Sequence, residues 1–369
     1  MARALESATV KRALASSGRV GLFAAGKAAA GMARVALAHL GSRAPALIVL
    51  PCGHSARGLP RRAVAFAAHP EPNAASLRAG RRAVRFFRSF GREDTILCLL
   101  SGGASSLLAV PREGLTLAQK RRRIRELART GAPIDALNRL RTKLSAIKGG
   151  RLGRSTAARL VTLVLSDVPG DRASLVGSGP TVRGRRRDLV RVVGSNRSGL
   201  EAATREARRI GLKPVLAPRR IAGEAARAGR RLARRAATLR PGSVLLAGGE
   251  TTVSLKDATP GGRGGRCLEL ALGAAEEIHH DHPITLLAAG SDGLDGNSGA
   301  AGAFADGSTV PRARATGMEP AAALARHDTR RLFAALEDLF VTGPTGTNVG
   351  DWVFLLRKPP TRGHRLKPL

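Results

Sequence analysis

Short apolar runs, each followed at once by glycine, serine or acidic residues, limit most strongly how this chain can fold. Such runs occupy Val20–Ala25, Thr95–Leu100, Val161–Leu165, Val244–Ala247 and Ile284–Ala288. Their length and composition are typical of strands buried in a sheet. In open α/β sheets, ligands bind outside the carboxyl ends of the strands. The pattern therefore predicts an α/β fold whose strand-end loops bind a polar, phosphorylated ligand.

The length and composition indicate a globular chain. With 369 residues and a hydrophobic fraction of 43%, the chain is long enough for two domains with their own cores. No apolar run is long enough to cross a bilayer, and the first residues lack the apolar centre of a secretory signal. Three scattered cysteines indicate neither a disulfide framework nor a zinc site. We expect a protein without a membrane partner that works in the reducing cytoplasm.

The charge is strongly positive, because 62 Lys and Arg outweigh 27 Asp and Glu to give +35. Such an excess attracts anionic small molecules and also supports non-specific binding of nucleic acid. The positive residues are spread over the whole chain, however, and aromatic residues, which would stack on bases, make up only 3%. We therefore expect a small anionic substrate and do not expect nucleic acid as the main partner.

The loop within Leu286–Gly302 carries two aspartates three residues apart, Asp292 and Asp295, each followed by a glycine. Carboxylates on such a loop suit Mg²⁺, which prefers oxygen ligands and keeps water and phosphate oxygens in its shell. The alternative is a polar turn whose aspartates only cap the next helix. Asp292 and Asp295 are therefore candidate metal ligands, and Asp167, which follows the Val161–Leu165 run, is a third.

Lys27 stands where a helix is expected to begin after the first strand. The free amides and the dipole at a helix start favour anions, so Lys27 is a candidate phosphate ligand, although an ordinary surface lysine also fits. From Gly21 the sequence reads G-x-x-x-x-G-K-A, which is close to a P-loop. We reject that motif, because the four intervening residues belong to the strand and Ala28 replaces the Ser or Thr that binds Mg²⁺.

The segment Ser101–Ser106 offers a dense set of hydrogen-bond donors. Gly102 and Gly103 expose backbone amides, and Ser101 and Ser105 add hydroxyls. A serine nucleophile is the competing hypothesis, but the G-x-S-x-G pattern of hydrolases is absent from this loop. We therefore expect a loop that binds phosphate or carboxylate.

Several segments between these loops are expected to be helical. Residues 1–17 fit one amphipathic helix, and residues 138–153 fit another that would end at its glycine pair. Residues 183–191 are rich in arginine and are expected to form an exposed loop that leads into a helix. The pair Pro241-Gly242 marks a domain boundary.

Two further segments carry cationic side chains that are long enough to bind an anion. Arg266 ends a glycine-rich run and precedes a helix, which suits bidentate binding of phosphate or carboxylate. A mobile Gly/Arg loop is the alternative. Arg141 and Lys148 extend from the predicted 138–153 helix, where a solvated basic face is the default interpretation.

Together these segments resemble the class II glycerate kinase family, the two-domain glycerate 2-kinases with a MOFRL C-terminal domain. The resemblance rests on motifs that follow family order over nearly the whole chain. They are Gly26-Lys27-Ala28-Ala29, Ser101-Gly102-Gly103-Ala104-Ser105, Asn138 with Arg141 and Leu144–Gly150, Ser166–Asp171, Gly177–Thr181, Gly248–Thr252, Gly264-Gly265-Arg266 with Glu269, Asp292-Gly293 with Asp295-Gly296, and Thr342–Val349. One such motif is weak, whereas this many in order is specific.

The resemblance implies an α/β fold of two Rossmann-like three-layer domains with an active-site cleft between them. It implies a glycerate kinase domain at residues 1–239, a MOFRL-like domain at 240–357 and a basic tail at 358–369. The implied activity is ATP-dependent phosphorylation of D-glycerate to 2-phosphoglycerate by direct, Mg²⁺-assisted transfer. The sequence leaves the oligomeric state open and allows a homodimer.

The resemblance also assigns site residues by motif position. Lys27, Arg266 and Asp292 are the implied catalytic residues, the first two as positive charges and Asp292 as a ligand of Mg²⁺ or a partner of the substrate hydroxyl. The residues implied to bind substrate or phosphate are Ser101, Gly102, Gly103, Ser105, Asn138, Arg141, Lys148, Glu250 and Thr251. The chain departs from the family at Ala136 and Lys143, where Glu and His are usual.

Two other functions remain open. Members of this family are sometimes named hydroxypyruvate reductases, but a nicotinamide enzyme should show G-x-G-x-x-G between a strand and a helix, and we find no such unit. The other is a catalytically altered relative that binds anions or nucleic acid without turnover.

Overall fold

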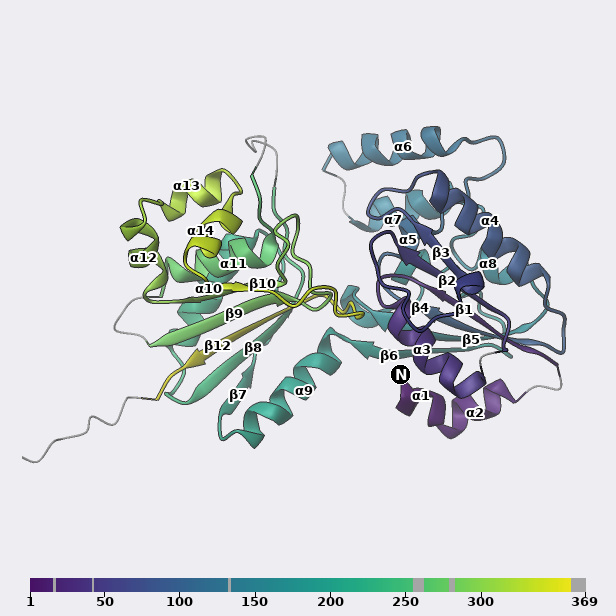
Figure 1. Ribbon diagram of the computed structural model, residues 1–369, viewed down its shortest axis with the longest axis horizontal. Coiled ribbons are helices and arrows are strands. Elements are labelled where there is room, and N and C mark those ends of the chain that lie inside the picture. The colour runs from purple at the N-terminus through teal and green to yellow at the C-terminus, as the bar shows by residue number, and fades with distance from the viewer. Residues whose placement is uncertain (16–17, 42, 132–133, 255–261, 279–282, 360–369) are drawn as a thin grey trace, which may run out of the picture. The chain divides into compact units, whose positions relative to one another are not determined.

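The computed structural model describes residues 1–15, 18–41, 43–131, 134–254, 262–278 and 283–359. The chain divides into two compact units. The first is Met1–Ser195 with Gly346–Val349, and the second is Asn196–Thr345 with the residues from Gly350 onward. Each unit is built on one six-stranded sheet (Figure 1). Among the described residues, every helix is too short or too polar to cross a membrane.

The first unit has an all-parallel sheet in the order β3-β2-β1-β4-β5-β6. The strands are β1 Val20–Ala25, β2 Ala46–Pro51, β3 Val64–Ala67, β4 Thr95–Leu100, β5 Arg159–Ser166 and β6 Leu189–Ser195. Because the order reverses at β1 and β4, the loops after these two strands flank the crevice where doubly wound sheets bind ligands.

Helices cover both faces of this sheet, as a fully buried parallel sheet requires. Apolar side chains of α1, α2 and α3 pack on one face, and those of α4, α5 and α8 pack on the other. The helices of the unit are α1 Ala2–Glu6, α2 Ala8–Leu14, α3 Ala29–Leu40, α4 Ala74–Arg88, α5 Ala104–Leu107, α6 Leu117–Arg129, α7 Ile134–Lys143 and α8 Arg151–Arg154, with 3₁₀ turns η1 Arg61–Ala63, η2 Pro169–Asp171 and η3 Val176–Ser178.

The second unit has a mixed sheet in the order β11-β10-β9-β12-β8-β7. Its strands are β7 Lys213–Leu216, β8 Ser243–Gly249, β9 Ile284–Gly290, β10 Gly302–Asp306, β11 Leu339–Phe340 and β12 Asp351–Arg357. One face packs against α9, and the other packs against α10, α11 and α14. The helices are α9 Asn196–Arg209, α10 Ala225–Ala237, α11 Arg266–Ala275, α12 Thr309–Ala315, α13 Pro320–Ala325 and α14 Thr329–Ala335.

The central strand β12 of this sheet runs antiparallel to both of its neighbours, β8 and β9. Consequently β12 begins at the edge where β8 and β9 end. Asp351, the first residue of β12, is paired with Gly249 on one side and Gly290 on the other. An acidic side chain from the start of one strand is therefore placed among the loops that follow two others.

The predicted fold class is confirmed, since both units are three-layer α/β structures and the five apolar runs form β1, β4, β5, β8 and β9. The second sheet adds antiparallel strands that the strand-and-loop pattern did not reveal. The compact units divide the chain after Ser195, earlier than the boundary predicted at 239/240. The reason is that β7 pairs with β8 and α10 packs against α11, so both belong to the second sheet.

Two predicted helices are interrupted. The segment 1–15 bends at Ser7, whose side chain accepts from the Val10 amide and caps α2. The helix predicted over 138–153 ends at Lys143, because Ser145 forms an isolated bridge with Pro111. The glycine pair 149–150 has positive φ angles of 61° and 76°, which a continuous helix cannot accommodate.

The arginine-rich segment 183–191 is not an exposed loop that leads into a helix. It leads into strand β6 instead. The Arg183 side chain is fully buried and forms an ion pair with Asp188 at 2.7 Å. It also donates to the carbonyls of Thr156 and Ala158, at 2.9 and 2.7 Å. Arg183 thus satisfies buried backbone groups between α8 and β5, a role the sequence did not reveal.

Candidate active site

In the first unit, Lys27 is fixed at the carboxyl edge of the sheet by the loop that follows β4. The Lys27 amide donates to the Gly102 carbonyl at 2.9 Å, and the Ala28 amide donates to Ser101 Oγ at 3.0 Å. Gly26 has a φ of 127°, and a Cβ at this position would collide with Ser101. Two motifs that lie far apart in the sequence therefore form one element at the crevice between β1 and β4.

The side chains of Lys27 and His69, both of which can bind an anion, lie next to Gly103. A Cβ at this position would stand 3.3 Å from Lys27 Cγ and 3.1 Å from the His69 ring carbon Cδ2. The φ of Gly103 is 86°, and this residue precedes the short helix α5, so the predicted loop Ser101–Ser106 is half helical. Lys27 and His69 thus converge on the first turn of α5.

Gly102 supports a second pair of polar side chains. A Cβ at Gly102 would stand 1.8 Å from Asp167 Oδ2 and 2.3 Å from Asn348 Nδ2. Asn348 Nδ2 also donates to Asp167 Oδ2 at 3.1 Å. Only glycine allows this close approach, so Asp167 and Asn348 are held against the same loop that holds Lys27.

Ser105 links this loop to the interior. Lys148 Nζ donates a short hydrogen bond to Ser105 Oγ, which lies 3.2 Å from Ser178 Oγ. Lys148 is only 4% exposed. Burial, together with the positive charges of Lys120 and Arg141, holds the pKa of Lys148 well below its usual value. A buried amine and two hydroxyls thus form a hydrogen-bonded chain behind the loop.

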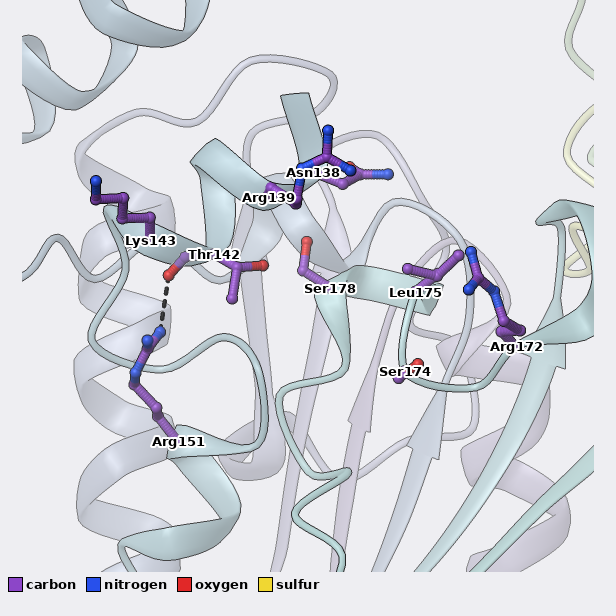
Figure 2. Close-up of a pocket in the computed structure, with 9 residues that line it drawn as sticks. All are labelled: Asn138, Arg139, Thr142, Lys143, Arg151, Arg172, Ser174, Leu175 and Ser178. Atoms are coloured by element: carbon purple, nitrogen blue, oxygen red, sulfur yellow. Dashed lines mark hydrogen bonds between the residues drawn. The ribbon is translucent and has the colours of Figure 1, made fainter. Parts of the chain in front are cut away.

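That chain reaches a pocket of about 570 Å³ within the first unit. Figure 2 shows the residues that line it, which come from α7, α8 and the segment around η3. They are Asn138, Arg139, Thr142, Lys143, Arg151, Arg172, Ser174, Leu175 and Ser178. Arg141 donates to Asn138 Oδ1 at 3.1 Å. The predicted residues Asn138 and Arg141 thus form one pair at this pocket, and Lys148 and Ser105 reach it through Ser178.

In the second unit, Arg266 is held by two carboxylates. Its guanidinium forms a bidentate pair with Asp351, at 2.6 and 3.0 Å, and a third contact with Glu250 Oε1 at 2.7 Å. Burial alone would lower the pKa of Arg266, but Asp351 and Glu250 raise it overall. Arg266 is therefore a fixed cation whose two partners differ, since Asp351 is buried and half of the Glu250 side chain is exposed.

The two aspartates of the predicted metal loop have different surroundings. Asp295 Oδ2 accepts from the Leu268 amide at 2.9 Å and so caps α11, the helix before it rather than the helix after it. Burial raises the pKa of Asp295 to about 6. Asp292 Oδ1 accepts from the Leu294 amide at 3.2 Å. The start of α11 thus occupies Asp295, whereas Asp292 is bonded within its own loop.

The donor set suits a hard cation only in part. No cluster of three or more His, Cys, Asp or Glu side chains that would hold a metal occurs within the described ranges. Mg²⁺ usually takes one or two protein carboxylates and completes its shell with water and phosphate oxygens. Asp292 in the second unit and Asp167 in the first fit that single-carboxylate role. Thr251 Oγ1 is buried and has no hydrogen-bond partner among the described residues, so it also has capacity for a ligand.

Asp351 was missed in the sequence, and it is the residue that orients Arg266. The available signal was an acidic residue next to a glycine at the start of the last predicted strand. Ser178 lay within a recognised motif but was not selected. His69 was also not selected, because nothing in the local sequence indicates that it reaches Gly103.

Comparisons with known proteins agree over most of the chain. A family model described as a domain of unknown function (DUF4147) matches residues 1–207, and the MOFRL family model matches residues 243–351. The D-glycerate 2-kinase of Thermotoga maritima is 33% identical over 91% of this chain and 90% of its own length. A protein of Agrobacterium vitis, provisionally named a hydroxypyruvate reductase, is 37% identical over 90% of this chain and 98% of its own.

A solved structure gives the same result in three dimensions. The crystal structure of a glycerate kinase from Thermotoga maritima superposes with a TM-score of 0.83. The match has 32% sequence identity and covers 96% of this chain and 95% of that one.

Proposed function

The chain belongs to the class II glycerate kinase family with a MOFRL domain, and on that premise we propose that it transfers the γ-phosphoryl group of ATP to the 2-hydroxyl of D-glycerate, giving 2-phosphoglycerate. Family membership makes the chain a glycerate kinase type of enzyme. Our proposal extends this finding to the use of ATP, the use of Mg²⁺ and the formation of the 2-phosphate isomer.

One observation carries the proposal: Lys27 is held against the Ser101–Gly103 loop at the crevice between β1 and β4. Doubly wound sheets bind ligands at this crevice. Phosphoryl transfer requires mainly positioning and neutralisation of charge on the transferred group. A lysine beside the backbone amides of this loop would supply both, because the amides orient the anion and the ammonium neutralises it.

Arg266 supplies a second positive charge in the second unit. We propose that Asp351 keeps the guanidinium oriented while the exposed Glu250 carboxylate exchanges for an anionic group of the substrate. The exchange is favoured at Glu250 because half of its side chain already contacts water, so the pair is weak and the released carboxylate is readily hydrated.

When bound, Mg²⁺ would supply positive charge that neutralises the phosphate oxygens of ATP during transfer. Either Asp292 of the second unit or Asp167 of the first would hold it through one carboxylate. Asp295 instead positions α11 and thereby the backbone from which Arg266 extends.

The decisive test is phosphorylation of D-glycerate by the full chain with ATP and Mg²⁺, with 2- and 3-phosphoglycerate resolved as products. We expect 2-phosphoglycerate, and we expect none in the absence of Mg²⁺. Formation of 3-phosphoglycerate, or phosphorylation that does not require ATP, would contradict the proposal.

A reductase is the second candidate, favoured by the name of the Agrobacterium vitis relative and by the strand order of the first sheet, which dinucleotide-binding folds share. It is tested by following NADH and NADPH oxidation with hydroxypyruvate. Turnover there without any phosphorylation of D-glycerate would replace the kinase proposal.

We also propose a cytoplasmic location, which is supported by three cysteines that remain free: Cys52, Cys98 and Cys267. Two of them are buried in the cores, where a thiol packs as a small apolar group.

A further inference from the structure

The pocket of the first unit, shown in Figure 2, has a marked charge imbalance. Four of its nine lining residues are Arg or Lys, and none is Asp or Glu. Arg151 is occupied, since its guanidinium donates to the carbonyls of Thr142 and Ser145 at 2.7 and 3.0 Å. Arg139, Lys143 and Arg172 have no carboxylate within ion-pair distance in the described part of the chain.

The three residues are exposed, so water screens their mutual repulsion, and an anion that enters the pocket neutralises part of their positive charge. A ligand with a single carboxylate neutralises only one of the three charges. A ligand with two or more anionic groups can neutralise more than one, and a volume of about 570 Å³ is within the range of small-molecule sites.

The inner wall of the pocket adds a second, independent feature. Ser178 is buried, and its hydroxyl joins the Ser105 hydroxyl and the buried Lys148 amine in one hydrogen-bonded chain. Arg141, which donates to Asn138, adds positive charge beside the same wall. Burial holds the pKa of Lys148 low, and an anion bound at Ser178 would favour the protonated form of this amine.

We propose that this pocket binds a small molecule with at least two anionic groups, held by Arg139, Lys143 and Arg172 and oriented by Ser178. The inference rests on the proposed kinase for the identity of the ligand. Two sources share this chemistry: a hydroxy acid with two carboxylates that serves as the phosphoryl acceptor, and the polyphosphate of a nucleotide.

Titration calorimetry of the full chain without Mg²⁺ tests the proposal, with tartronate and pyrophosphate as dianionic or more highly charged probes and D-glycerate as the monoanion. We expect at least one of the two multiply charged probes to bind roughly tenfold or more tightly than D-glycerate. Equal or weaker binding of both would overturn the inference.

Matched variants separate this pocket from the general positive charge of the chain. Arg139→Gln and Lys143→Gln should each weaken binding of the preferred probe roughly fivefold, whereas Lys143→Arg should retain it. Arg205→Gln, which removes an exposed charge on α9 in the other unit, is the control and should have little effect. Pocket variants that behave like Arg205→Gln would contradict the proposal.

Competition distinguishes the two sources. If ATP displaces tartronate and both are weakened by Lys143→Gln, the pocket takes a polyphosphate. If ATP and tartronate bind together and only tartronate is weakened, the pocket takes a dicarboxylic acceptor. Failure of the kinase assay together with tight, Lys143-dependent binding would reject the proposed function alone, and 2-phosphoglycerate formation without a multianion preference would reject this inference alone.

Discussion

The two units bring opposite kinds of charge to the candidate site residues. In the first unit, Lys27, Lys148 and the pocket cations lie beside serine hydroxyls and glycine amides, with Asp167 as the nearby carboxylate. In the second unit, one arginine is enclosed by carboxylates. The first unit is therefore suited to receive anions, whereas the second fixes one cation between two carboxylates.

Removal of the positive charge of Lys27 should have the largest effect. Lys27→Ala should lower kcat for D-glycerate by about a hundredfold or more, because the charge of the transferred group is then no longer neutralised. Steady-state kinetics with a thermal melt measures the change and confirms that the fold is intact. Lys11→Ala, at an exposed position of α2, is the matched control. Near-normal turnover in Lys27→Ala would remove the lysine from the mechanism.

The second unit should respond mainly in stability. Asp351→Asn leaves the Arg266 guanidinium without its buried partner, and the free energy of unfolding should fall by about 2–3 kcal/mol. Glu250→Gln removes the exposed partner of the same arginine and should change it by less than about 1 kcal/mol. Urea denaturation at pH 7 compares the two variants. Equal losses would show that the two carboxylates are equivalent.

The buried residue Lys120 allows the stability cost of an unpaired positive charge in the first unit to be measured. Its ammonium is buried, has no hydrogen-bond partner in the described residues, and burial lowers its pKa from 10.5 to about 8. Between these values the unfolded chain holds a proton that the folded chain has lost, so stability rises as pH rises from 8 to 10.5. Below pH 8 the penalty is fully present.

Lys120→Met should therefore increase the free energy of unfolding at pH 7 by on the order of 2 kcal/mol, and the gain should vanish above pH 10.5. Denaturation curves across this pH range, with Lys11→Met as the exposed control, measure the effect. A gain that is the same at pH 7 and pH 11 would show that improved packing, rather than charge, is its cause.

A pair of glycine substitutions compares the two units at the same level of detail. Gly102→Ala forces Asp167 and Asn348 apart, so kcat/KM should fall roughly tenfold with little change in melting temperature. Gly290→Ala brings a methyl group 3.2 Å from Asp292 and 3.5 Å from Asp351, a contact that small shifts relieve, so activity should change little. If both variants lose activity equally, the proposed importance of the Asp167–Asn348 pair is wrong.

Much of the candidate site was predictable because it lies immediately after apolar strands. The loop after β4 and the turn after β1 were both found from local composition, and their contact follows from the parallel order of the sheet. The prediction of one helix over 138–153 was wrong, because the spacing of apolar residues carries no information about the bridge between Ser145 and Pro111. The expected cleft between the units stays a prediction.

The sequence by itself determined the strands, the glycine-rich loops after them and the family, since each depends on residues that are neighbours in the chain. Only the tertiary structure determined which carboxylates and hydroxyls contact the residues of these loops. Asp351 reaches Arg266 only because β12 runs antiparallel between β8 and β9. Ser178 reaches Ser105 across 73 positions of sequence, and such pairings arise from sheet order and packing, which no local pattern encodes.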